Sequence, residues 1–332
     1  MKRIVPVFLA VVSLCWLIGS ADCSNNKTVA DNQNVAYEID LLASDSIHGV
    51  YATDTMDAYA ELAPNDSSNG TYYYQGVPGH KIRHHLKSDS SDIFVDYNIT
   101  FLDLHTEITK SLFCRTHSML REWGFVSDND TIAPFRAEDK NSQKEIMDAA
   151  IGWSKECFYK EVKDLYEYGE YGYYIFISIY PVWLTNDIVT YCIKEETYTG
   201  GAHGNYDYYL ESFDRETGES LFEKDILIGD KMEKVSTIIT RHLAAIHECS
   251  TVNEYLGNLN KWRNDLDQFF TYEGKKKLKK YTARTFPIGT AGLRKEGIVF
   301  SYPRYSIAPG VEAVPTVFIP YDEIRDCLKI KL

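Results

Sequence analysis

His203 is the residue whose type and surroundings most favour chemistry. It lies in a bend at residues 198–205, where three of five consecutive positions are glycine: Gly200, Gly201 and Gly204. Glycines allow backbone conformations that a Cβ forbids. An imidazole at such a bend, close in sequence to Glu195 and Glu196, could act as a general acid or base. The alternative is that the glycines serve only the turn and that loop carbonyls satisfy the imidazole, since no nucleophile stands at motif spacing.

A second candidate is the loop at residues 302–310, which is suited to binding rather than catalysis. Tyrosine and arginine are favoured anchors of interfaces, and prolines limit the entropy that a loop loses on association. We therefore predict binding roles for Tyr302, Pro303, Tyr305 and Pro309. From the first bend, the same prediction includes Tyr198, Gly200, Gly201, His203 and Gly204. The alternative for the second loop is a structural role, in which it plugs a sheet edge.

Histidines also gather at residues 80–85, a run that could bind a metal opportunistically: His80, His84 and His85. Neighbouring side chains on a strand point to opposite faces, and no carboxylate or thiol pattern accompanies the run. We therefore predict an exposed loop there, and neither a metal nor a cofactor for the chain. The same alternation argues against Glu195 and Glu196 as paired catalytic carboxylates.

The formal net charge of −13 bears on the choice of partner. Nucleic acid is not expected, because phosphate binding needs a basic field. A cationic protein partner is favoured electrostatically, although acidity also serves solubility alone. The 25 tyrosines are expected to lie half-buried on sheets or to line contact surfaces.

The N-terminus is predicted to be a signal peptide over residues 1–22. Lys2 and Arg3 precede an apolar stretch at residues 4–18 that is too short for a stable membrane span. Cleavage before Cys23 would make this residue a lipidation site and residues 23–37 a polar tether, whereas cleavage without lipidation would give a soluble exported protein. The predicted location is the bacterial cell envelope, either the periplasm or the outer membrane or cell surface as a lipoprotein.

Periodicity predicts an α+β fold with antiparallel sheets and helices packed on one face. After an irregular region at residues 38–90 that contains one short strand at 72–74, strands are expected at 93–102, 173–180, 188–198, 206–213, 297–302 and 313–319. Helices are expected at 103–124, 142–169 and 231–247 and after Pro320, with a solvated helical face at 275–280. We divide the folded chain into an N-terminal α+β part, residues 38–200, and a C-terminal α+β module, residues 201–332.

Four segments, in this order, carry a resemblance to a known family: residues 198–204, 214–218, 221–227 and 301–321. The chain resembles the RsiV-like family of bacterial envelope domains, whose C-terminal module has no assigned activity. The best understood member of that family is an anti-sigma factor whose exported domain binds lysozyme, and related copies precede peptidoglycan deacetylase domains. The present sequence departs from these relatives, because it shows no sigma-binding region, no internal transmembrane helix and no deacetylase metal ligands.

The resemblance implies an exported, non-catalytic module that binds a protein or a cell-wall glycan, with a cationic lysozyme-like protein as the leading partner. The alternative is a cell-wall glycan hydrolase or esterase that uses His203. A structural envelope protein without a small ligand is a third hypothesis.

Overall fold

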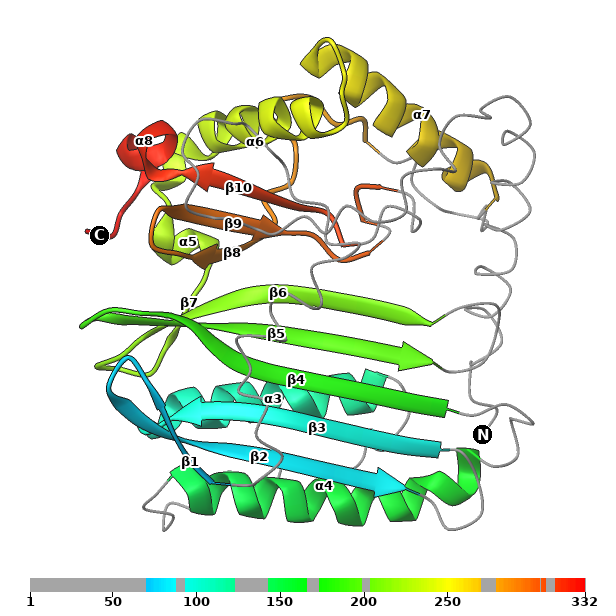
Figure 1. The fold of residues 1–332 in the computed structure, drawn as a ribbon. Helices are drawn as coiled ribbons and strands as arrows, with labels where there is room; N and C mark the ends of the chain where they lie inside the picture. Colours follow the sequence, from blue (N-terminus) through cyan, green and yellow to red (C-terminus); the bar gives the residue numbers. More distant parts are fainter. Residues whose placement is uncertain are drawn as a thin grey trace, which may run out of the picture.

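The computed structural model describes residues 70–87, 93–122, 143–165, 173–198, 204–269, 279–304, 306–308 and 314–331. These residues form a seven-stranded sheet, in the order β1-β2-β3-β4-β5-β6-β7, and a three-stranded sheet, in the order β10-β9-β8. Figure 1 shows the small sheet beside β6, with helices accompanying each sheet. The predicted α+β class is confirmed.

The N-terminal strands form an antiparallel meander of β1 (Gly70–Tyr74), β2 (Val77–Lys87) and β3 (Ile93–Leu102). Gln75 and Gly76 join the first two with positive φ angles of 50° and 83°, as a type I′ hairpin requires. The exposed loop predicted at residues 80–85 is wrong, because these residues belong to β2. Ile82 and Leu86 are buried in the core. The histidines around them conceal this apolar spacing in the sequence.

β4 (Tyr173–Leu184) pairs in parallel with β3, from Ile93 opposite Tyr173 to Ile99 opposite Ile179. The chain reaches β4 through α3 (Thr106–Glu122) and α4 (Gln143–Leu165). A helical crossover of this kind returns the chain to the same end of the sheet, which parallel pairing needs. The remaining strand pairs of the described residues are antiparallel, as predicted.

β5 (Ile188–Tyr198), β6 (Asn205–Asp214) and the short β7 (Ser220–Leu221) continue the sheet. After β6 the chain turns at Asp214, whose carboxylate accepts the N–H groups of Glu216 and Thr217 at 2.9 and 2.8 Å. The boundary that the sequence analysis draws at residue 200 falls between β5 and β6. These two strands are paired neighbours in one sheet.

One face of the large sheet is covered by α3 and α4. Many of the strand residues that point to this side are buried, for example Val95, Ile177 and Tyr191. The helices pack against them with apolar side chains that include Ile108, Leu112 and Phe158. Among the described residues no helix packs on the other face of this sheet, which we call the open face.

The C-terminal part builds a second core between the small sheet and its own helices. The strands are β8 (Thr290–Leu293), β9 (Gly297–Ser301) and β10 (Thr316–Pro320). The helical segments are α5 (Glu223–Ile226), η3 (Gly229–Lys231), α6 (Met232–Ile246), α7 (Val252–Phe269), α8 (Tyr321–Ile324) and η5 (Arg325–Cys327). α6 confirms the helix predicted at 231–247, and α8 follows Pro320 as predicted. α7 and β8 were not predicted from the sequence, and most of the solvated helical face predicted at 275–280 lies outside the described residues.

The small sheet packs against one end of the open face of the large sheet. Gly292 of β8 lies so close to β6 that an added Cβ would stand 2.1 Å from the Cβ of Leu210. Leu293 N–H donates to Ser212 Oγ at 2.9 Å, and Tyr208 Oη lies 3.1 Å from Thr316 Oγ1. The two sheets thus touch along β6, and the contact reaches β5 and β4, because Ile188 belongs to the second core and Trp183 packs against it.

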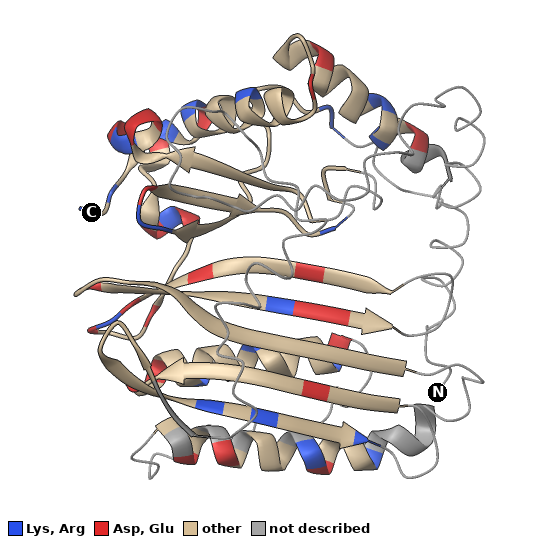
Figure 2. Cartoon of the chain, viewed as in Figure 1, with Lys and Arg blue, Asp and Glu red and all other residues tan. Residues whose placement is uncertain are grey.

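Charged side chains are interspersed by sign over the described helices and strands (Figure 2). None of the helices in this part of the chain is long and apolar enough to cross a membrane. No disulfide joins the cysteines that the structure describes, of which Cys157, Cys192 and Cys327 are buried.

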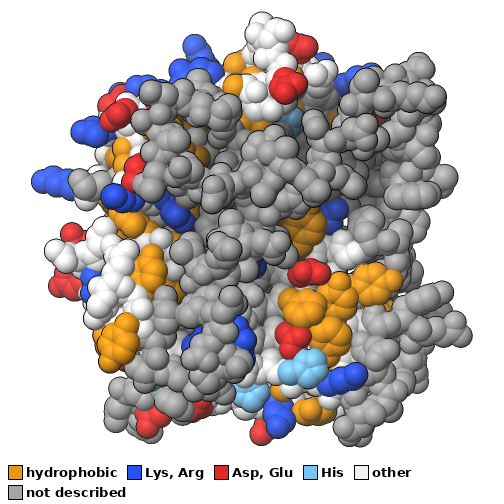
Figure 3. All heavy atoms as spheres, in the orientation of Figure 1, with side chains coloured by type: hydrophobic (Ala, Val, Ile, Leu, Met, Phe, Trp, Pro, Cys, Tyr) orange, Lys and Arg blue, Asp and Glu red, His pale blue; other side chains and the backbone are white. Residues whose placement is uncertain are grey.

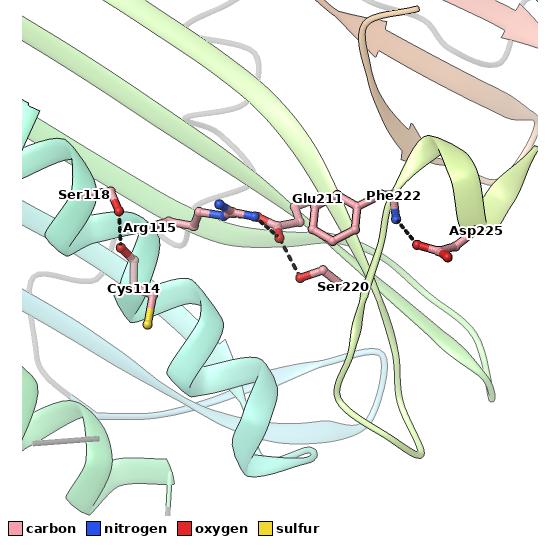
Figure 4. A network of polar contacts seen from close by, with 7 residues as sticks. All are labelled: Cys114, Arg115, Ser118, Glu211, Ser220, Phe222 and Asp225. Carbon is pink, nitrogen blue, oxygen red and sulfur yellow. Dashed lines mark hydrogen bonds and ion pairs between the residues drawn. The ribbon is translucent and has the colours of Figure 1, made fainter. Parts of the chain in front are cut away.

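A buried ion pair ties α3 to β6 (Figure 4). Arg115 donates from Nε and Nη2 to the two carboxylate oxygens of Glu211, each at 3.0 Å, and Ser220 Oγ donates to Glu211 at 2.7 Å. The Glu211 side chain is 5% exposed and that of Arg115 38%. A bidentate pair of this geometry fixes the helix against the strand.

Arg115→Ala is expected to lower the free energy of unfolding by about 2 kcal/mol, because it leaves the Glu211 carboxylate buried without its counter-ion. The figure is reduced from that of a fully buried pair since Arg115 is partly exposed. Urea unfolding followed by circular dichroism measures the change. Lys234→Ala is the control, since its ion pair with Asp326 is exposed, and it should leave the midpoint nearly unchanged. Equal effects of the two substitutions would contradict the assignment.

Candidate binding surface

The face of the large sheet opposite α3 and α4 carries a row of aromatic side chains. In β3, β4 and β5, register places Phe94, Tyr174 and Tyr198 side by side. The ring centroids of Phe94 and Tyr174 are 5.4 Å apart and those of Tyr174 and Tyr198 are 5.8 Å apart, with nearly parallel planes. We call these three residues the aromatic rung. It includes Tyr198, one of the predicted binding residues.

The next row, two residues further along each strand, mixes charge and aromatic surface. His85, Asp96, Phe176 and Glu196 lie opposite one another in register, and we call them the middle rung. Phe176 stands edge-on to Tyr174 at 5.0 Å and is 36% exposed. Figure 3 shows hydrophobic side chains gathered beside acidic and histidine side chains over this sheet.

Polar contacts hold the middle rung in place. His85 Nδ1 lies 2.6 Å from Asp96 Oδ1, and the imidazole packs on Phe94 with ring centroids 5.4 Å apart. Tyr174 Oη donates to Glu196 Oε1 at 3.2 Å. Burial, and then the neighbouring charge of Glu196, raise the pKa of Tyr174, so this hydroxyl stays a donor. The aromatic rings are thus ordered before any ligand arrives.

The structure brings the two predicted binding segments together through Arg304. Its Nη1 donates to the Gly204 carbonyl at 3.1 Å and to Asn205 Oδ1 at 3.3 Å. Its guanidinium also lies over the ring of Tyr206, 4.9 Å from the centroid. A cation over an aromatic face is attracted by the ring quadrupole. The predicted residues Gly200, Gly201, His203, Tyr305 and Pro309 lie outside the described residues.

Tyr302 does not belong to the exposed surface, and the role of displayed anchor predicted for it is wrong. Its side chain is 3% exposed, its hydroxyl donates to the Pro287 carbonyl at 3.0 Å, and its ring packs on Phe286. Burial raises the pKa of this phenol. The hydroxyl finds its polar partner inside the second core, so the residue packs instead of projecting. Pro303, the next residue, is exposed.

Glu195 and Glu196 point to opposite faces of β5, as strand alternation predicts. Glu195 lies on the helical side, opposite Asp207 of β6. Both residues line a pocket of about 190 Å³ together with Glu122 of α3. Burial raises the pKa of Asp207 to about 7, and the charge of Glu122 adds to the rise. The sequence analysis missed this carboxylate pair. The register pairs Thr197 with Asn205 and therefore Glu195 with Asp207, whereas counting outward from residues 198 and 205 would have placed Glu196 opposite Asp207.

Asp207→Asn is expected to stabilise the protein more at pH 8 than at pH 4. The folded chain keeps the Asp207 proton up to about pH 7, whereas the ordinary pKa is 3.8, so wild-type stability falls as the pH rises between these values. The substitution should remove this loss, on the order of 2 kcal/mol at pH 8. Thermal unfolding across pH 4–8 measures it. Asp187→Asn, at an exposed turn, is the control, and an equal pH response of both variants would refute the argument.

Within the described residues no group of three His, Cys, Asp or Glu side chains is placed to hold a metal ion. His242 of α6 contacts Glu323, while His247, the residue after this helix, packs on Tyr255, so these two histidines do not converge. The arrangement of the open face can bind a ligand by stacking and hydrogen bonding. It presents no nucleophile activated by an adjacent base among the contacts described above.

Comparison with known proteins adds two structural neighbours. No protein-family model and no curated protein sequence matches the chain. It is similar to a crystal structure of a member of the DUF3298 family from Bacteroides fragilis, with a TM-score of 0.47 and 17% identity over 80% of this chain and 96% of the other. It is also similar to a DUF3298 family protein from Pseudomonas aeruginosa, with a TM-score of 0.41 and 17% identity over the same shares. The RsiV-like assignment stays a prediction.

Proposed function

We propose that this chain is an exported, lipid-anchored bacterial envelope protein of the RsiV-like kind, whose folded part is a non-catalytic binding module. The ligand is a protein or a cell-wall glycan, with a cationic lysozyme-like protein as the leading protein candidate. The ligand contacts the aromatic and middle rungs. The observation that carries the proposal is the row of stacked rings beside the exposed Phe176.

Two physical features support binding at this face. Aromatic side chains contribute large contact areas at low entropic cost, and here they are already held by contacts with one another and with Glu196. The net charge of −13 favours the approach of a cationic protein. Both features exist before the ligand binds. Preorganised rings raise the affinity, and electrostatic steering raises the association rate.

Phe176→Ala and Tyr174→Ala are each expected to weaken binding to lysozyme or to isolated cell walls by at least about tenfold, the effect of losing a central aromatic anchor. Calorimetry with lysozyme at low salt and co-sedimentation with cell walls measure it. Tyr159→Ala is the matched control, because Tyr159 is 39% exposed but belongs to α4, on the helical side of the sheet. If both ligands bind the wild type and all three variants equally well, the open face is not the binding surface.

Cys23→Ser is expected to move the protein from the membrane fraction to the soluble exported fraction, because thioether lipidation needs the cysteine sulfur. Intact-mass analysis of the wild type should then show a lipid adduct that is missing from the variant. Cys114→Ser, at a cysteine within α3, is the control and should leave the distribution unchanged. A wild type of unmodified mass in the membrane fraction would contradict the anchor.

A further inference from the structure

A shallow groove of about 480 Å³ crosses the open face next to Phe176. Its lining includes the middle-rung residues His85, Asp96 and Phe176. It also includes Arg83, Asn98 and Ser178, which register places opposite one another one row further along β2, β3 and β4. We call these last three residues the polar rung. Successive rows on one face of a strand are about 6.6 Å apart, so the groove spans two rows and three strands.

The three rows form a gradient from apolar to polar across the sheet. The aromatic rung offers rings, the middle rung offers one exposed ring between charged groups, and the polar rung offers a guanidinium, an amide and a hydroxyl. Amides and hydroxyls both donate and accept hydrogen bonds. A ligand lying across the rows therefore meets apolar surface on one side and hydrogen-bonding groups of both kinds on the other.

The charges of the groove balance locally, although the chain as a whole is acidic. The lining carries one formal positive charge, on Arg83, and one formal negative charge, on Asp96, whose carboxylate lies 2.6 Å from His85 Nδ1. An anionic polymer is repelled by the net charge of −13, and a cationic group gains little from a lining whose charges cancel. An uncharged ligand is the kind that this balance fits.

We propose that the groove binds an uncharged glycan chain, with a sugar ring packed on Phe176 and its hydroxyl or acetamido groups hydrogen-bonded to Asn98 and Ser178. This inference rests on the proposed function and names the ligand class of the same face. A sugar ring has an apolar C–H side and a rim of groups that donate and accept, which matches the order of the rows. A protein ligand would use the aromatic rung and Glu196 without needing the polar rung.

Calorimetry with chitohexaose and cellohexaose, two uncharged glycans, tests the inference on the protein as it is exported. Wild type is expected to bind at least one of them. Asn98→Ala and Ser178→Ala should each weaken that binding about tenfold, the effect of a lost hydrogen bond to a desolvated group, and Phe176→Leu should weaken it as much or more. Asn186→Ala, an exposed asparagine in the turn between β4 and β5, is the control. Thermal unfolding confirms that each variant is folded, and Ser178→Ala makes the smallest change in volume.

Lysozyme binding, measured on the same variants, distinguishes failure of the glycan site from failure of the proposed binding function. Loss of glycan binding in the Asn98 and Ser178 variants, with binding in the Asn186 variant unchanged, supports the glycan site. Binding of lysozyme but of neither glycan, with sensitivity only to Phe176, overturns the glycan inference and leaves the proposed function standing. Glycan binding that is indifferent to Asn98, Ser178 and Phe176 overturns the placement of the site, and binding of neither ligand class overturns both proposals.

Discussion

Alternation of side chains along β3 to β6 is the constraint on which the architecture depends. Each strand turns every second residue toward α3 and α4. Most of these positions are apolar, as Val95, Ile177 and Tyr191 illustrate, and the exceptions include Glu195, Asp207 and Glu211. The residues in between are then obliged to face away from the helices. A one-residue slip in any of these strands would exchange the two sets, so the buried face specifies the composition of the open face as well.

Two different chemistries result from this single geometry at Glu195 and Glu196. Glu195 joins Asp207 on the helical side, near Arg115 and its partner Glu211, where burial favours the protonated carboxyl of Asp207. Glu196 accepts a hydrogen bond from Tyr174 among the rings of the open face. The small sheet covers part of that face, because Gly292 brings it against Leu210 of β6 and Val299 packs on the buried cluster that includes Cys192 of β5.

Much of the fold could be predicted from the sequence, because long amphipathic helices and strands of regular period leave clear patterns. α6 and the strands β3 to β6 are examples. β2 was missed because its polar residues include three histidines, and β8 because four residues give too short a pattern. Of the site, Tyr198 was predicted as a binding residue, whereas the contact between the two predicted segments through Arg304 was not predicted. The rungs were not predicted either, since they combine residues from β2, β3, β4 and β5 whose register only the folded sheet defines. Tyr302 failed because a tyrosine in a proline-rich loop looks the same whether its hydroxyl meets water or a buried carbonyl.

The parallel pairing of β3 with β4 has a consequence for how the chain acquires its shape. The first three strands are a local meander, but their sheet can grow only after both helices and β4 have been synthesised. Until then β3 is an unprotected edge rich in apolar residues, the kind of edge that invites association with other chains. Closure across this seam joins residues far apart in the sequence, which slows folding relative to a purely sequential meander. Completion of the large sheet, including its open face, therefore depends on the pairing of β3 with β4.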